Sequence, residues 1–181
     1  MCYAGLYAGT SKRVTHVSDY FCAMKKSVLF VCLGNICRSP MAEAIFKHKI
    51  TEMGLNSTVF ADSCGTGDYH IGQGPDARTV SALRKNGVEI AHTVRQLAVS
   101  DFETFDHILV MDQKNYENTL RVADARHHTK VELMRTYDPQ GGEEVPDPYF
   151  GTARDFDEVF VMLDRSIQHF INRQVIKTSE K

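Results

Sequence analysis

Residues 27–44 read Ser-Val-Leu-Phe-Val-Cys-Leu-Gly-Asn-Ile-Cys-Arg-Ser-Pro-Met-Ala-Glu-Ala, and this stretch decides the fold. The run up to Cys32 is rich in β-branched and aromatic residues, which is typical of a strand buried on both faces. Ser39 before Pro40 has the pattern of an N-cap followed by a first helical residue. Apolar side chains then recur at helical spacing until Gly54. The stretch therefore predicts a strand, a tight loop and a helix.

The same alternation continues to the end of the chain. Further strands are predicted over residues 58–61, 107–111 and 131–134, and further helices over 76–86 and 113–125. An apolar stripe over residues 156–171 predicts a long C-terminal helix. Strands separated by helices indicate an α/β fold, a single-domain parallel sheet of about four strands flanked by helices. Ligands of such sheets bind beyond the carboxyl ends of the strands, and the loop after the first strand lies at such an end.

Composition bounds the possible functions. The chain has 181 residues, of which 43% are hydrophobic, which suits one compact domain. Its 21 basic and 23 acidic side chains give a net charge of -2, so nothing favours a nucleic-acid or membrane partner. No apolar run reaches about 18 residues, and the amino-terminal segment lacks the apolar core of a secretory signal. We expect a cytoplasmic protein.

Residues 1–26 lack clear periodicity, so we expect an N-terminal extension without regular structure, followed by a domain over 27–177 and a tail over 178–181. The five cysteines are an odd number with no CxxC pair, which argues against a disulfide framework or a structural zinc site. His127 and His128 lack the spacing of metal ligands and are expected in a solvated loop. We expect neither a metal nor a cofactor.

The chemistry is concentrated in Cys32-x5-Arg38. A loop of this length can bring backbone amides and one guanidinium together around a tetrahedral oxyanion, with a thiolate beneath it. Cys32 alone would be an inert core thiol, but Arg38 and the helix start favour a nucleophile, which the Ser39 hydroxyl and the positive helix end would stabilise. A positive φ is expected at Gly34 and Asn35. The predicted phosphate-binding residues are Leu33, Gly34, Asn35, Ile36, Cys37 and Arg38.

A thiolate that displaces an alkoxide or phenoxide from phosphorus also needs a proton donor for the leaving oxygen. Two Asp-Pro pairs qualify, Asp138-Pro139 and Asp147-Pro148. Either can equally be a plain loop turn. The residues alone leave this choice open.

The run from Val28 to Ala44 resembles the signature of the low-molecular-weight protein tyrosine phosphatases, and the likeness extends over about residues 26–176. It implies a cytoplasmic hydrolase with acid phosphatase activity, acting on phosphotyrosine proteins and small aryl phosphates through a phosphocysteine intermediate. Phosphate-like oxyanions would inhibit it. Cys32 would be the nucleophile, Arg38 the phosphate clamp and Asp147 the general acid and base, because the family's acid opens an Asp-Pro-Tyr motif; Asp138 would be a structural turn.

The resemblance also implies supporting roles. A hydrogen-bond network holding the loop would comprise Asn35, Ser39, Ser63 and His92. The substrate rim would comprise Tyr69, Tyr149 and Phe150, with Leu33 and Ile36 beside them, although Tyr149 and Phe150 can also be read as ordinary surface aromatics. Asp112 would lie near the site or simply cap the following helix. Cys37 would be the redox partner of Cys32 in a reversible disulfide, and Cys64 a small core residue.

Three alternative functions are disfavoured by the residues. A thiol-based arsenate reductase shares the Cys-x5-Arg loop but needs further cysteines downstream, and none follows Cys64. A phosphoarginine phosphatase typically has Thr where this loop has Ile36. A binding module that has lost turnover would keep Arg38 but would have no use for a nucleophile and an acid, both of which are present.

Overall fold

The computed structural model describes residues 26–176, and its centre is a parallel four-stranded sheet in the order β2-β1-β3-β4. The strands are β1 (Lys26–Cys32), β2 (Val59–Gly65), β3 (His107–Val110) and β4 (Val131–Leu133). Val28 of β1 pairs with Ala61 on one side and His107 on the other, so the strand that ends at Cys32 is internal. The predicted α/β class and parallel sheet are confirmed.

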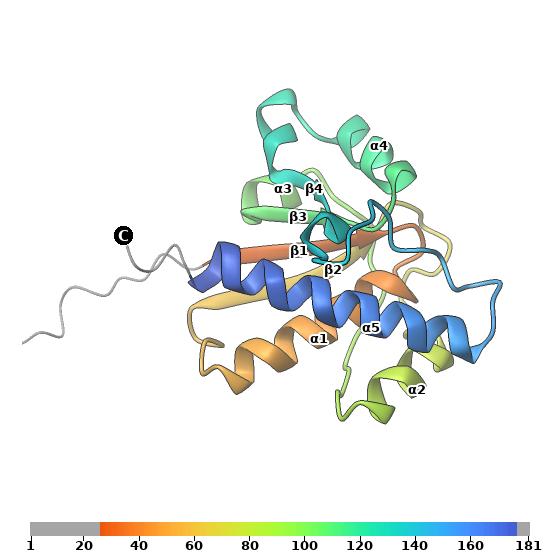
Figure 1. Cartoon of the computed structure of the whole chain (residues 1–181). Coiled ribbons are helices and arrows are strands. Elements are labelled where there is room, and N and C mark those ends of the chain that lie inside the picture. Colours follow the sequence, from red (N-terminus) through yellow and green to blue (C-terminus); the bar gives the residue numbers. More distant parts are fainter. Residues whose placement is uncertain (1–25, 177–181) are drawn as a thin grey trace, which may run out of the picture.

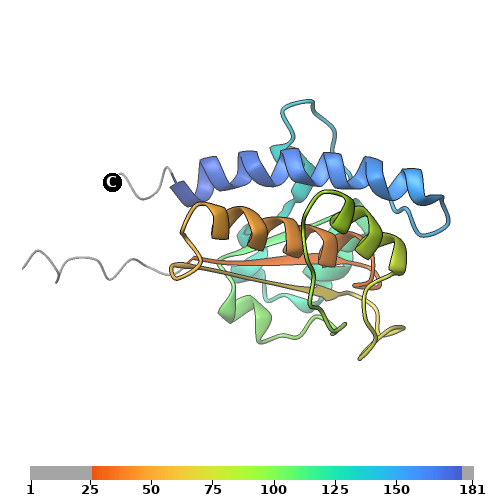
Figure 2. The same ribbon diagram turned by 90° about the horizontal axis from the view of Figure 1, so that it is seen from below.

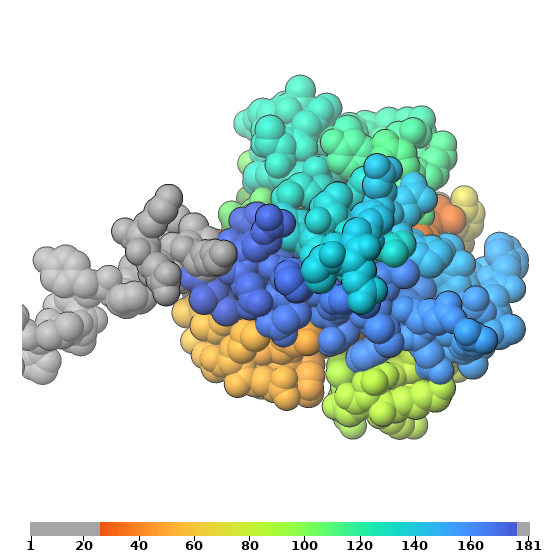
Figure 3. Space-filling model, viewed as in Figure 1, coloured from red at the N-terminus to blue at the C-terminus, as the bar shows by residue number. Residues whose placement is uncertain are grey.

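Helices cover both faces of the sheet (Figures 1 and 2). One face carries α1 (Arg38–Glu52), α2 (Ala77–Lys85) and α5 (Ala153–Phe170), and the other carries α3 (Asp101–Thr104) and α4 (Gln113–Val122). Short helical turns complete the chain: η2 (Ala125–Lys130), η3 (Met134–Tyr137) and the π-helical η4 (Ile171–Ile176). In the space-filling view α5 lies across the front of the molecule, in blue, above α1 in orange (Figure 3).

The alternation of side chains along β1 builds two cores. Val28 and Phe30 face α1 and α5, whereas Leu29 and Val31 face α3 and α4. All four are fully buried, and the Phe30 ring meets Phe46 of α1 edge to face at 5.6 Å between centroids. Truncation of a buried aromatic such as Phe46 to Ala costs about 3–5 kcal/mol, so packing on both faces holds the end of β1 in place.

Two predictions about the loop are wrong in detail. Helix α1 begins at Arg38 with Cys37 as its N-cap, so Ser39 lies inside the first turn and is not the cap. Its hydroxyl contacts the Cys32 sulfur at 3.0 Å. A positive φ occurs at Asn35 (φ 54) but not at Gly34. Gly34 is instead constrained by space, since a Cβ there would lie 3.2 Å from the ring of His70.

Other differences lie away from the loop. Helix α4 ends at Val122, before the predicted residue 125, because Asp124 caps a new turn by accepting from Arg126 N at 3.0 Å. The prediction of a solvated loop at His127 is wrong: this ring is buried and stacks on Phe102 at 6.2 Å. The short helix α3 was not predicted, since four residues carry too little periodicity to be recognised.

The predicted extension, apart from Lys26, and the predicted tail over 178–181 lie outside the described residues. Within residues 26–176 no helix combines the length and the apolar character needed to cross a membrane. The carboxyl ends of β1 and β3 point to the same edge of the sheet, where the loop after β1 and the segment before α5 come together (Figure 1). This edge carries the site.

Candidate active site

Cys32 is the last residue of β1, and its sulfur lies beneath the loop that leads into α1. The side chain is buried, with the residue 3% exposed. The backbone N–H of Asn35 donates to the sulfur at 3.2 Å, and Ser39 Oγ lies 3.0 Å from it. The side-chain amide of Asn35 donates to Ser39 Oγ at 2.9 Å, so the one hydroxyl hydrogen of Ser39 is shared between the sulfur at 3.0 Å and the Cys64 carbonyl oxygen at 3.3 Å. The Asn35 N–H, the Ser39 hydroxyl and the amino-terminal end of α1 therefore all lie around the Cys32 sulfur.

Asn35 organises the loop with both ends of its buried side chain. Its amide nitrogen also donates to Ser63 Oγ at 2.9 Å, which ties the loop to β2. Its carbonyl oxygen accepts from Arg95 N at 3.1 Å and lies 3.1 Å from His92 Nε2. The structure therefore brings together Asn35, Ser39, Ser63 and His92, the four residues expected in the network. The left-handed backbone at Asn35 is the conformation that allows this side chain to reach them.

Glu43 completes this network, and sequence analysis missed it. Its Oε2 accepts from Ser63 Oγ at 2.7 Å and lies 3.2 Å from His92 Nδ1, while Lys47 pairs with its other oxygen. Burial opposes ionisation of Glu43, but hydrogen bonds from His92, Lys47 and Ser63 outweigh it, so the pKa of this carboxyl lies below its usual value. The one signal was a carboxylate between alanines on the buried side of α1.

Arg38 is the first residue of α1, and its guanidinium is buried and oriented by three acceptors. Nη1 donates to Asp112 Oδ2 at 2.6 Å and to Val145 O at 3.1 Å, and Nη2 donates to Asp147 Oδ2 at 2.7 Å. Burial opposes its charge, but Cys32 and the two carboxylates outweigh burial and raise the pKa of Arg38. The guanidinium is thus a fixed cation beside the Cys32 sulfur.

Asp112 has both roles considered for it. One oxygen holds Arg38, and the other accepts from Asn115 N at 2.6 Å as the N-cap of α4. A single side chain therefore connects the end of β3 to the arginine and starts the next helix.

The two Asp-Pro aspartates lie in different environments. The Asp138 side chain is fully buried and accepts two hydrogen bonds from Arg165, each at 2.6 Å. These bonds lower the pKa of Asp138 and occupy both oxygens, which suits a structural turn. The Asp147 side chain is 43% exposed and touches Arg38. Only Asp147 lines the pocket around Cys32, so the geometry favours it as the proton donor.

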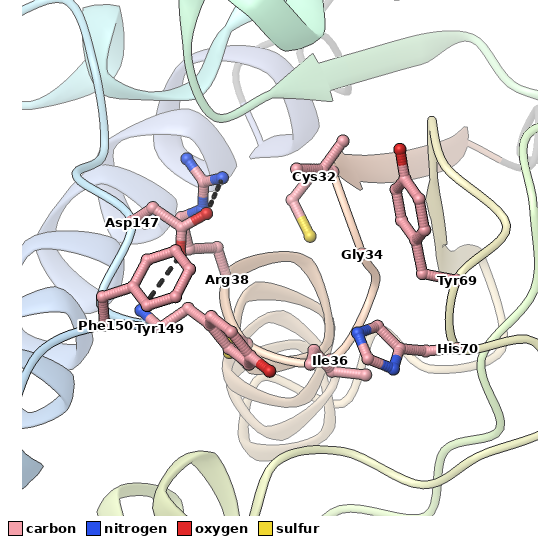
Figure 4. A pocket seen from close by; sticks show the side chains of 11 residues that line it. Cys32, Gly34, Ile36, Arg38, Tyr69, His70, Asp147, Tyr149 and Phe150 are labelled. Atoms are coloured by element: carbon pink, nitrogen blue, oxygen red, sulfur yellow. Dashed lines mark hydrogen bonds and ion pairs between the residues drawn. The ribbon is translucent and has the colours of Figure 1, made fainter.

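The pocket above Cys32 has a volume of about 210 Å³. Figure 4 shows Tyr149 and Phe150 on one side of the sulfur and Tyr69 and His70 on the other. Tyr69 is 71% exposed and Phe150 is 97% exposed, so both rings stand at the mouth. The wall comprises Leu33, Gly34, Ile36, Cys37 and Arg38. All three predicted rim aromatics are brought together; His70 was missed, because a single histidine in a loop carries no pattern.

The other two thiols among residues 26–176, those of Cys37 and Cys64, are buried and free. Cys37 is 4% exposed, and burial, with Asp76 next, raises the pKa of its thiol to about 12. A disulfide between Cys37 and Cys32 stays a prediction. Cys64 is fully buried in the core, as expected. Within residues 26–176 no three His, Cys, Asp or Glu side chains gather in a way that would hold a metal ion.

Comparison with known proteins gives consistent matches. The family model described as low molecular weight phosphotyrosine protein phosphatase matches residues 27–181. Proteins of that name from Sus scrofa and Schizosaccharomyces pombe are 42% and 44% identical; the alignments cover 82% and 80% of this chain and 95% and 94% of those proteins. A crystal structure of protein tyrosine phosphatase from Entamoeba histolytica, with Hepes in the active site, matches with a TM-score of 0.82 and 34% identity, over 87% of this chain and 100% of that one.

Proposed function

The chain belongs to the low molecular weight phosphotyrosine protein phosphatase family and is a protein tyrosine phosphatase, and from this premise we propose which residues carry out the reaction. Cys32 is the nucleophile, Arg38 binds the phosphoryl group and Asp147 is the general acid and base. The observation that carries the proposal is the convergence of these three side chains on one pocket, with Arg38 Nη2 bonded to Asp147 at 2.7 Å. This is the set that phosphoryl transfer through a thiolate requires.

In the first step the Cys32 thiolate attacks phosphorus in line, so that a sulfur–phosphorus bond forms as the phosphorus–oxygen bond to tyrosine breaks. The bonding pair leaves with the tyrosine oxygen, which takes a proton from Asp147. Arg38 and the backbone amides of residues 33–38 other than Asn35, whose N–H faces the sulfur, hold the equatorial phosphoryl oxygens and offset their charge in the transition state. When substrate binds, a phosphoryl oxygen would accept the hydrogen bond that Arg38 Nη2 donates to Asp147. The Asp147 carboxyl would then be free to donate its proton to the leaving oxygen.

In the second step Asp147, now a carboxylate, takes a proton from water as the water oxygen bonds to phosphorus. The sulfur–phosphorus bond breaks and its electron pair returns to Cys32. Ser39 and Asn35 stabilise that thiolate, so the donors that favour the nucleophile also favour its departure. Inorganic phosphate is released. Each step is balanced by groups on this chain, and none calls on a metal.

The rim supports phosphotyrosine as the substrate. Leu33 and Ile36 provide apolar wall on one side of a phenyl ring, and Tyr149 provides an aromatic face on another. A phosphoserine side chain is shorter and has no ring to stack, so we infer a preference for phosphotyrosine proteins and small aryl phosphates. Phosphate-like oxyanions would compete for the loop. We also propose that the protein has acid phosphatase activity and is located in the cytoplasm.

The test is hydrolysis of an aryl phosphate and of a phosphotyrosine peptide, in the presence of a chelator. Cys32→Ser should abolish turnover. Asp147→Asn should lower kcat/KM for phenyl phosphate by about 10²-fold or more, which is the typical contribution of a general acid. The matched control is Asp138→Asn, which should retain most of the activity while it remains folded. Loss of activity in Asp138→Asn with retention in Asp147→Asn would reverse the assignment of the acid.

A further inference from the structure

Arg78, in the first turn of α2, joins the segment that carries Asp147 to the phosphate-binding loop. Its side chain is first fixed by Asp76, the N-cap of α2: Nε donates to Asp76 Oδ1 at 3.0 Å and Nη2 donates to Oδ2 at 2.8 Å. The guanidinium also lies over the ring of Phe156, with Cζ 4.4 Å from the centroid. A bidentate pair and a stacked ring together fix the plane of the guanidinium.

The remaining N–H groups of Arg78 reach the backbone just after Asp147. Nη2 donates to Tyr149 O at 3.0 Å and Nη1 donates to Gly151 O at 3.1 Å, so the arginine holds the chain on both sides of Phe150. Of the side chains outside this segment, no other among residues 26–176 donates to the backbone of residues 148–151. Residues 148–151 form no regular element, so Arg78 fixes the chain after Asp147, whereas Arg38 and Met111 hold it at Val145 before Asp147.

The other end of the connection is the phosphate-binding loop. Asp76 N donates to Ile36 O at 2.9 Å, and Thr79 Oγ1 donates to Ile36 O at 3.2 Å. Asp76 and Arg78 therefore set the segment of Asp147 against the loop of Cys32. General acid catalysis needs this separation to be correct, because a displacement of about 1 Å can cost a factor of about 10² in rate.

We propose that Arg78 is a positioning residue for Asp147, which places the acid over the leaving oxygen without touching the substrate. This inference rests on the proposed role of Asp147. Its consequence is selective: loss of the clamp impairs proton delivery, on which poor leaving groups depend, but leaves phosphate binding by Arg38 and the loop in place. Lysine cannot replace Arg78, because an ammonium lacks the planar fork that serves one carboxylate and two carbonyls at once.

The experiment measures kcat/KM for a series of aryl phosphates whose leaving groups range from strongly acidic to weakly acidic phenols. This parameter includes the step in which the phenol departs. Arg78→Met and Arg78→Lys should lower kcat/KM for phenyl phosphate about tenfold and for the most acidic phenol less than about threefold, with phosphate inhibition unchanged. The matched control is Arg154→Met, because Arg154 is 86% exposed and, within residues 26–176, has an ion pair with Glu158 alone, so this variant should behave like wild type. Should Arg78→Met fail to fold, Arg78→Lys carries the test.

Combination with Asp147→Asn separates positioning from a general structural role. If Arg78 acts through Asp147, Arg78→Met should cause little further loss in an Asp147→Asn background. Equal losses for all leaving groups, weaker phosphate inhibition, or full additivity with Asp147→Asn would overturn the inference while leaving the proposed function intact. Absence of any leaving-group dependence in Asp147→Asn itself would overturn both.

Discussion

Asp112 Oδ2 accepts a hydrogen bond from Arg38 Nη1 at 2.6 Å, which ties the phosphate-binding arginine to the residue two positions after the end of β3. The other oxygen of Asp112 caps α4 through Asn115 N. The orientation of Arg38 therefore depends on Asp112 as well as on the loop after β1. The guanidinium is also held by the N-cap of α4, before any substrate enters.

The two functions of Asp112 can be separated by substitution. Asp112→Asn keeps an oxygen for the cap but removes the charge that faces Arg38, whereas Asp112→Ala removes both. Each should lower kcat/KM on an aryl phosphate by about tenfold, equivalent to about 1.4 kcal/mol. Only Asp112→Ala should lose the cap as well, so urea denaturation should find it less stable than Asp112→Asn by about 1 kcal/mol. Wild-type kinetics in both variants would show that Asp112 is only a cap.

Asn35 combines a strained backbone with buried hydrogen bonds. Asn35→Ala should lower the free energy of unfolding by about 2–3 kcal/mol, because an alanine in the left-handed region costs about 1–2 kcal/mol and the former partners lose a buried hydrogen bond. Asn35→Gly loses the same hydrogen bonds but avoids the steric cost of a Cβ at positive φ, so its stability should lie between those of wild type and Asn35→Ala. Both variants should lose activity, since neither holds Ser39. Equal stability of the glycine and alanine variants would show that backbone strain contributes nothing.

The charge of Glu43 should contribute to stability at neutral pH. Its pKa is lower in the folded protein than the ordinary value of 4.5, so ionised Glu43 stabilises the fold above that value. The contribution is lost as pH falls through the lower, folded-state pKa. Urea denaturation should therefore find a difference between wild type and Glu43→Gln at about pH 7 that shrinks toward about pH 3.

Glu158→Gln is the control for this comparison, since Glu158 is 60% exposed and pairs with Arg154 at the surface. It should give a small difference with little dependence on pH. A stability difference for Glu43→Gln that grows on acidification would mean that Glu43 is more easily protonated in the folded protein, contrary to our account.

The thiol of Cys37 should remain protonated well above neutral pH, because its pKa is raised to about 12. In Cys32→Ser, alkylation of Cys37 should be slow at neutral pH and should still accelerate above about pH 10, since only the thiolate reacts. Peptide mass spectrometry resolves Cys37 from the other cysteines, and protein unfolded in urea provides the reference. A rate that levels off near about pH 9, as an ordinary thiol would, contradicts the prediction.

Much of the fold could be predicted from the sequence because local pattern and tertiary structure agree. The strand that ends at Cys32 is one continuous apolar run, and apolar side chains recur at helical spacing after Arg38 and along α5. The start of α1 was misplaced because Ser39 has the composition of a cap but bonds to the Cys32 sulfur. Side-chain chemistry alone does not choose between a local backbone partner and a distant one.

The site was only partly predictable, because several of its residues act through partners that are distant in the sequence. The loop from Cys32 to Arg38 is contiguous, so its spacing is visible in one line of sequence. The choice between Asp138 and Asp147 required tertiary information, since burial against Arg165 distinguishes them. Glu43 and Arg78 were missed because their roles arise from contacts with segments distant in sequence, and nothing local marks a glutamate or an arginine that bonds elsewhere.

The central claim is that Cys32 carries the phosphoryl group between the two steps, and rapid quenching tests it most directly. Asp147→Asn, mixed with an aryl phosphate of a strongly acidic phenol and quenched in acid, should accumulate the intermediate because no base activates water. Mass spectrometry of the digested protein should find one phosphoryl group on Cys32 in the peptide that spans the loop. Turnover without any phosphorylated Cys32, or a phosphoryl group on another residue, would contradict the account.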